Sequence, residues 1–235
     1  KNCDNILNVS SLSNCKNLTL SELNISNINT FSSCDNLTLY RCDNITNVST
    51  LSNCKNLKLL FCKNIFDVSS LCNCHYLTLT SLNITDISTL SNCKNLKLSW
   101  CKNIFDVSFL SNCHNLILSD CENISNVNVL SNCNNLVLSG LKITDVSALG
   151  NCKNLTLQFC DNILDVSALG NCYNLKLLCC NNITNFNGLS SCKKLTLNSL
   201  NISDVSVFSN CHDLTLNNCN YITNVSSLDS VSNLI

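Results

Sequence analysis

The sequence predicts a β-rich solenoid of about twelve coils, each 19 or 20 residues long, with a parallel sheet of short L-x-L strands. Two observations carry this prediction: a cysteine opens nearly every unit at this spacing, and two leucines recur one residue apart within it. The opening residues are Cys15, Cys34, Cys54, Cys74, Cys93, Cys113, Cys133, Cys152, Cys172, Cys192 and Cys211, with Val231 in the twelfth unit. Their spacing repeats every three units, which gives a higher-order repeat of 59 residues.

The L-x-L step has a period of two, which is typical of a short strand with both leucines inward. The two leucine columns run without substitution from Leu18 to Leu234 and from Leu20 to Leu216. An unbroken column from Ile6 to Ile222, a Val or Ile column and a second Leu column complete the expected core. One coil cannot bury these side chains alone, so neighbouring coils must stack on it.

Turns must be built from Asn, Asp and Ser, because the chain has four Gly and no Pro. We expect the asparagines before the first leucine to form an amide ladder between coils, namely Asn17, Asn36, Asn56, Asn95, Asn115, Asn135, Asn154 and Asn174. We expect a second column to cap the D-V-S turn, namely Asn47, Asp67, Asp86, Asp106, Asn126, Asp145 and Asp165. Calcium binding is the alternative for this second column.

One segment carries a family resemblance. Residues 152–163, CKNLTLQFCDNI, resemble the strand segment LxxLxLxxCxxI of leucine-rich repeats, and residues 164–171, LDVSALGN, resemble the D-I-S-x-L convex turn of internalin-like repeats. The match covers essentially the whole chain, but the opening Leu is nearly always Cys and the units are short for the family. The resemblance implies a leucine-rich-repeat fold. Units this short leave no room for a convex α-helix, so we expect extended or 3₁₀ backbone on the convex side. The alternative is a parallel β-helix with two or three strands per coil.

We expect residues 1–235 to form a single repeat solenoid of four 59-residue super-repeats, each with three coils. The sequence opens inside a unit at residues 1–6 and closes inside a unit at residues 231–235, without a polar capping repeat. This pattern predicts an uncapped part of a longer array, or copies that stack end to end.

The 21 cysteines are compatible with disulfides, metal sites or core packing. A second cysteine column holds Cys3, Cys42, Cys62, Cys101, Cys121, Cys160, Cys180 and Cys219, with Leu23, Leu82, Leu141 and Leu200 between them. A column that accepts Leu is apolar, and free Cys behaves as a small hydrophobe. We therefore expect packed free thiols. Reduced thiols indicate a reducing compartment such as the cytoplasm, although the residues do not exclude an extracellular location.

Composition and motifs favour no catalytic chemistry. A net charge of −1 gives no indication of nucleic-acid binding, and no apolar run approaches the roughly 18 residues of a membrane span. The three histidines share a column with lysines, which indicates a solvent-facing position. Adjacent residues such as Cys74 and His75 point to opposite sides of a strand, so they do not predict a catalytic dyad. We expect no enzymatic activity, no metal site and no cofactor.

Large side chains gather at the outward positions after the leucines, which predicts a partner-binding face. Its candidate residues are Tyr40, Arg41, Phe61, Trp100, Phe159 and Leu178. Aromatic and Arg residues on a rigid sheet are typical of interface hot spots, although scattered surface side chains are the alternative. The predicted function is a non-catalytic scaffold for protein–protein interaction. The alternative is a structural rod or fibre that elongates by end-to-end self-association.

Overall fold

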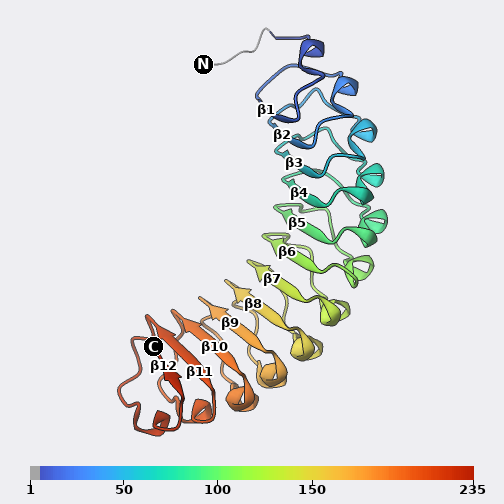
Figure 1. Ribbon diagram of the computed structural model, residues 1–235. Helices are drawn as coiled ribbons and strands as arrows, with labels where there is room; N and C mark the ends of the chain where they lie inside the picture. Colours follow the sequence, from blue (N-terminus) through green and yellow to red (C-terminus); the bar gives the residue numbers. More distant parts are fainter. Residues whose placement is uncertain (1–5) are drawn as a thin grey trace. The chain divides into compact units, whose positions relative to one another are not determined.

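The computed structural model describes residues 6–235, which form two compact units that meet between Asn123 and Ile124 in the sequence. Each unit is described by itself. In both, the strands lie on one side of the coils and 3₁₀ helices lie on the opposite side (Figure 1). Cys3, which the sequence places in the core, lies outside the described residues, as does most of the opening segment 1–6.

Each coil contributes one short strand. The first unit holds β1 (Asn17–Ser21), β2 (Asn36–Tyr40), β3 (Asn56–Leu60), β4 (Tyr76–Thr80), β5 (Asn95–Ser99) and β6 (Asn115–Ser119). The second holds β7 (Asn135–Ser139), β8 (Asn154–Gln158), β9 (Asn174–Leu178), β10 (Lys194–Asn198), β11 (Asp213–Asn217) and β12 (Asn233–Leu234). Within each unit, consecutive strands pair in parallel with equivalent coil positions opposite each other, as Leu57 and Leu77 show.

The opposite side is built of 3₁₀ helices, as the short units predicted. They are η1 (Ser10–Leu12), η2 (Asn29–Phe31), η3 (Ser49–Leu51), η4 (Ser69–Asn73), η5 (Ser88–Asn92) and η6 (Ser108–Leu110) in the first unit. The second unit has η7 (Asn128–Asn132), η8 (Ser147–Asn151), η9 (Ser167–Asn171), η10 (Asn187–Ser191), η11 (Ser206–Phe208) and η12 (Ser226–Leu228). Between residues 6 and 235, no helix is long and apolar enough to cross a bilayer.

The predicted columns fill the core except in the terminal coils, where Ile6, Val225 and Leu234 are 41%, 49% and 45% exposed because no further coil packs on them. We number coil positions from the opening cysteine as position 1, so that the strand leucines occupy positions 4 and 6. In the coil that opens at Cys54, Leu57, Leu59, Ile65 and Leu71 are all fully buried. Outside the named strands, the described residues show one isolated bridge, Asp165 to Asn185. The structure is therefore a leucine-rich-repeat-like solenoid and excludes the parallel β-helix.

Coil length determines the residue at position 9. Every 19-residue coil carries Leu there and every complete 20-residue coil carries Cys. The additional residue closes a tight turn, in which Ile163 N–H donates to Cys160 O at 3.2 Å. The Cys160 thiol in turn contacts the carbonyl of Gln158 at 3.3 Å, as a weak sulfur hydrogen bond. Position 9 is thus apolar, as predicted. In the longer coils its thiol also donates a weak hydrogen bond to a carbonyl of the strand.

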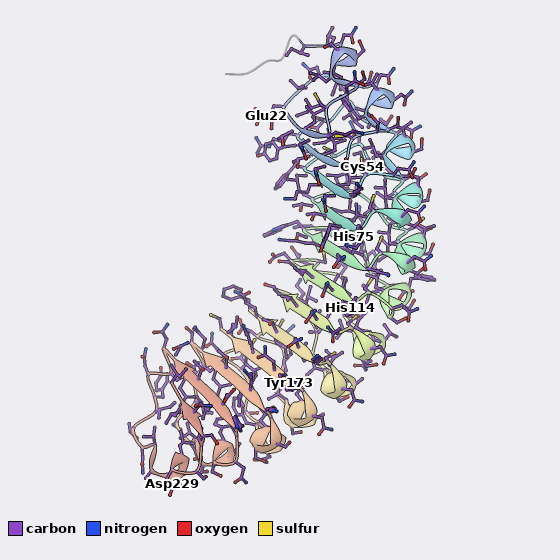
Figure 2. All side chains as sticks on the ribbon, viewed as in Figure 1. Glu22, Cys54, His75, His114, Tyr173 and Asp229 are labelled. Carbon is purple, nitrogen blue, oxygen red and sulfur yellow. The ribbon has the colours of Figure 1, made fainter. Side chains whose placement is uncertain are left out.

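The cysteines pack as predicted. Both columns are buried except for Cys15 and Cys219, which are partly exposed, and Figure 2 shows Cys54 between the strand and the 3₁₀ helices. The 20 described cysteines form no disulfide with one another in the structure. Burial raises the pKa of Cys74 to about 12, so its thiol is neutral at physiological pH. This protonation state is typical of structural rather than nucleophilic cysteines.

Two polar networks connect and cap the coils. The Asn ladder is confirmed for several steps: Asn36 donates to Asn17, Asn56 to Asn36, Asn115 to Asn95 and Asn154 to Asn135. The capping prediction is confirmed in all twelve coils, where an Asn or Asp side chain accepts the N–H of the first 3₁₀ residue at 2.7 to 3.2 Å. Hydrogen bonds from the Ser147 backbone and the Asn128 side chain lower the pKa of Asp145 to about 2.

Candidate functional site

The predicted partner-binding residues lie along the edge where the strands end. We call this the strand-end edge and define it by coil positions 7 and 8. Tyr40 and Leu178 are the last residues of β2 and β9, at position 7. The other four, Arg41, Phe61, Trp100 and Phe159, occupy position 8, one residue beyond a strand. The sequence therefore identified one edge of the sheet rather than its face.

Position 8 has a left-handed backbone in all eleven coils from Cys15 to Cys211. Gly140 has a φ of 61°, and the ten other residues, which are not glycine, have φ between 50° and 58°. The geometry follows from two constraints. The N–H of position 8 extends the ladder to the next strand, as from Phe61 to Thr80 O at 2.8 Å, while position 9 must turn into the core. A non-glycine residue pays about 1–2 kcal/mol for this conformation.

The first unit gathers four of these edge side chains into one cluster. The rings of Tyr40 and Phe61 meet edge to face with centroids 5.7 Å apart and planes at 71°. The Arg41 guanidinium carbon lies 5.2 Å from the Tyr40 ring centre, and Arg41 forms an ion pair of 3.4 Å with Glu22, which Figure 2 labels. Aromatic pairs and cation–π contacts of this kind stabilise exposed side chains in one arrangement. The cluster is therefore an ordered surface.

Trp100 lies further along the same edge. It is two coils beyond Phe61, with Thr80 and Ser81 at the edge of the coil between them. Its indole is 49% exposed, and Phe61 is 36% exposed. The first unit thus presents two large aromatic side chains that the core does not need.

The second unit has its own, smaller strand-end edge. Phe159 is 53% exposed and its N–H donates to Leu178 O at 3.0 Å, so these two predicted residues lie in adjacent coils. Cys179 follows Leu178 at position 8, with a φ of 52°.

The sequence analysis missed a second exposed aromatic group on the side of the 3₁₀ helices. Phe66 and Phe105 are at position 13, directly after the buried Ile, and are 59% and 65% exposed; Phe109 is 46% exposed. Their backbone φ is not positive. The sequence did hold a signal for this group: Phe shares the column after the buried Ile with Thr and Ser, which indicates a solvent-facing position.

Neighbouring histidine and cysteine side chains lie in different surroundings. His75, His114 and His212 are all exposed at position 2, as predicted, whereas Cys74 points into the core; Figure 2 labels His75 and His114. His212 Nδ1 lies 2.8 Å from Asp213 Oδ1, and Asp213 also accepts a hydrogen bond from Asn233. Among residues 6–235, no group of three or more His, Cys, Asp or Glu residues is placed to hold a metal ion.

Comparison with known proteins supports the fold. No protein-family model and no curated protein sequence matches the chain. Among solved structures, an internalin (InlF) from Listeria monocytogenes is 27% identical with a TM-score of 0.65, over 97% of this chain and 77% of that one. The functional domain of InlJ from L. monocytogenes, described as including a cysteine ladder, is 17% identical with a TM-score of 0.45, over 89% and 60%.

The similarity to InlF supports the leucine-rich-repeat-like fold described above. A Leptospira interrogans leucine-rich-repeat protein is also similar, at 13% identity and a TM-score of 0.32, over 89% of this chain and 86% of that one. The structural neighbours are leucine-rich-repeat proteins, and such solenoids typically serve as interaction scaffolds because their repeats form extended binding surfaces.

Proposed function

We propose that this protein is a non-catalytic scaffold that binds a protein partner through its strand-end edge. In the first unit the contact residues are Tyr40, Arg41, Phe61 and Trp100, and in the second unit they are Phe159 and Leu178. Aromatic and Arg side chains dominate the energetics of protein interfaces because they bury large areas at low entropic cost.

The observation that carries the proposal is the choice of residues at position 8. Gly140 shows that glycine is accommodated there, and glycine adopts a left-handed backbone at no steric cost. Phe61, Trp100 and Phe159 instead hold large, exposed side chains in the left-handed conformation. The fold imposes this backbone conformation, and large side chains held in a strained conformation are typical of functional positions.

The test is capture of a partner by the chain with a photo-crosslinker beside the edge, compared with the Phe61→Ser/Trp100→Ser double variant. We expect the variant to recover at least about tenfold less cross-linked partner, because two hot-spot side chains are lost. Ser81 and Ser199 occupy position 8 in the native chain, so serine is compatible with the fold there.

The matched control is Phe66→Ser/Phe105→Ser. It also removes two exposed phenyl rings from the first unit, and serine directly follows the buried Ile in the native chain at Ser26 and Ser125. This control should capture the partner normally. Unchanged capture by the Phe61→Ser/Trp100→Ser variant would contradict the proposal.

A second candidate function is end-to-end self-association. Its supporting observation is the exposure of core-column residues in the last two coils. Val225 is 49% exposed, whereas the equivalent Val166 is 1% exposed, and Leu234 in the final coil is 45% exposed. This candidate predicts a sedimentation mass that rises with concentration for the unaltered chain and stays at that of one chain for Leu234→Asp. A constant mass for the unaltered chain would rule it out.

A further inference from the structure

We propose that an acidic polypeptide segment docks on the outward surface of the sheet, along the first half of the strands. The surface is defined by the lysines at coil positions 2, 3 and 5, and we call these lysines the basic strip. In the first unit they are Lys16, Lys55, Lys58, Lys94 and Lys97; in the second they are Lys153, Lys176, Lys193 and Lys194. The basic strip runs from the strand starts, at positions 2 and 3, to the middle of the strands, at position 5, and includes no residue of the strand-end edge. This inference therefore does not rest on the function proposed above.

Charge is segregated in this chain. Nine of its 14 basic residues lie at positions 2, 3 and 5, together with two of its 15 acidic residues, Asp35 and Asp213. The acidic residues gather elsewhere, for example in the column that caps the 3₁₀ helices. A net charge of −1 therefore conceals a positive strip in each unit, and such a strip attracts negatively charged partners.

The lysines of the strip are available for a partner. All nine are exposed. Among the described residues, two of them form ion pairs with carboxylates: Lys55 with Asp35 at 3.0 Å and Lys194 with Asp213 at 3.3 Å. Lys193 lies 5.2 Å from the ring centre of Tyr173, which Figure 2 labels. Both units thus keep an excess of exposed positive charge on this surface.

Each unit also has an open groove on this surface. The groove of the first unit, about 650 Å³, is lined by Asn36, Thr38, Asn56, Lys58 and Thr78 among others. The groove of the second unit, about 660 Å³, includes Lys176, Lys194, Thr196 and Thr215. Lysines are therefore interleaved with hydroxyl and amide groups that can bind a peptide backbone.

The composition of the surface favours a polypeptide over a nucleic acid. The strip contains no Arg, the residue best suited to bidentate contact with phosphate. It also has no continuous row of aromatic side chains on which successive bases could stack. Tyr76 and Ile117 instead line a shallow hollow together with Lys97. This hollow suits a peptide in which apolar side chains lie next to a carboxylate.

The strand register suggests the spacing of the acidic residues. Lys58 pairs with Thr78, and Thr78 pairs with Lys97, so the two lysines are separated by two strand spacings, about 10 Å. An extended chain covers about the same distance in three residues. A segment that crosses the strands with Glu or Asp at every third residue therefore matches the strip.

The probe is a fluorescent peptide of four Glu-Val-Thr triplets, titrated with the 235-residue chain and followed by anisotropy. We expect binding at low salt that weakens at physiological salt. Lys58→Gln/Lys97→Gln should weaken it about three- to tenfold, because two exposed charge pairs are lost. Lys63→Gln/Lys102→Gln removes the same charge from the first unit outside the strip and should change affinity less than about twofold.

Three outcomes would overturn the proposal. One is equal binding of the peptide and its Gln-Val-Thr analogue. Another is an equal loss of affinity in the two double-Lys variants, which would show attraction to overall charge alone. The third is tighter binding of a single-stranded DNA or heparin oligosaccharide with the same dependence on Lys58 and Lys97, which would assign the strip to a different polyanion. Phe61→Ser/Trp100→Ser should bind the peptide normally, which separates this test from that of the strand-end edge.

Discussion

Replacing Leu59 with Ala should lower the free energy of unfolding by about 2–5 kcal/mol, the largest effect that we expect from a single substitution. Leu59 is fully buried at position 6 and pairs with Leu39 and Leu79 in the neighbouring coils. The substitution removes apolar contacts and leaves a cavity between stacked coils that their rigid backbone ladder cannot close. Urea unfolding measures this loss of stability. The fluorescence of Trp100, the single Trp of the chain, reports on it because Trp100 lies in the same unit as Leu59.

The control for this prediction is the adjacent residue. Lys58→Ala changes an exposed, outward side chain on the same strand and should alter the free energy of unfolding by less than about 0.5 kcal/mol. Equal effects of the two substitutions would show that β3 does not alternate between core and solvent as described.

Gly188→Ala should destabilise the second unit by about 1–3 kcal/mol, because the coils are too close at this point for a side chain. A Cβ at Gly188 would lie 1.7 Å from the carbonyl oxygen of Ser167 in the preceding coil. The same two coils are also tied by the Val166 N–H bond to Asn185 O, at 3.0 Å. The backbone must therefore move or lose this hydrogen bond, and urea unfolding followed by circular dichroism measures the cost.

Val207→Ala is the matched control, since Val207 is the second residue of η11, as Gly188 is of η10, and is partly exposed. We expect its free energy of unfolding to change by less than about 0.5 kcal/mol. If Gly188→Ala unfolded at the same urea concentration as the unaltered chain, the close approach of these coils would be wrong.

The core could be predicted because stacking imposes one residue type on each column. Leu, Ile and Val columns are visible in the sequence, and the structure places them in the interior. The Asn ladder and the capping Asp column were also predictable, since each needs a side chain with a carbonyl or carboxylate oxygen at a fixed position. The confirmed bonds from Asn36 to Asn17 and from Ser147 to Asp145 follow from this requirement.

The strand-end edge was only partly predictable. Its aromatic residues were identified from their size, but their left-handed backbone was not, because only Asp120, Gly140 and Asn218 at position 8 are of types that favour it. The constraint comes from hydrogen bonds to the next strand, which sequence does not show. The columns of the basic strip were visible in the sequence, because Lys58 and Lys97 each lie between the two leucines of an L-x-L step. What the strand register adds is their separation of two strand spacings.

The central claim is that position 8 keeps large side chains at a cost in backbone energy. The direct measurement compares glycine and alanine at Trp100 and at Phe66, by urea unfolding of all four variants with circular dichroism. At Trp100 we expect the glycine variant to be more stable than the alanine variant by about 1 kcal/mol. At Phe66, where φ is not positive, alanine should be more stable by about 0.5–1 kcal/mol. The same order of stability at both positions would contradict the account.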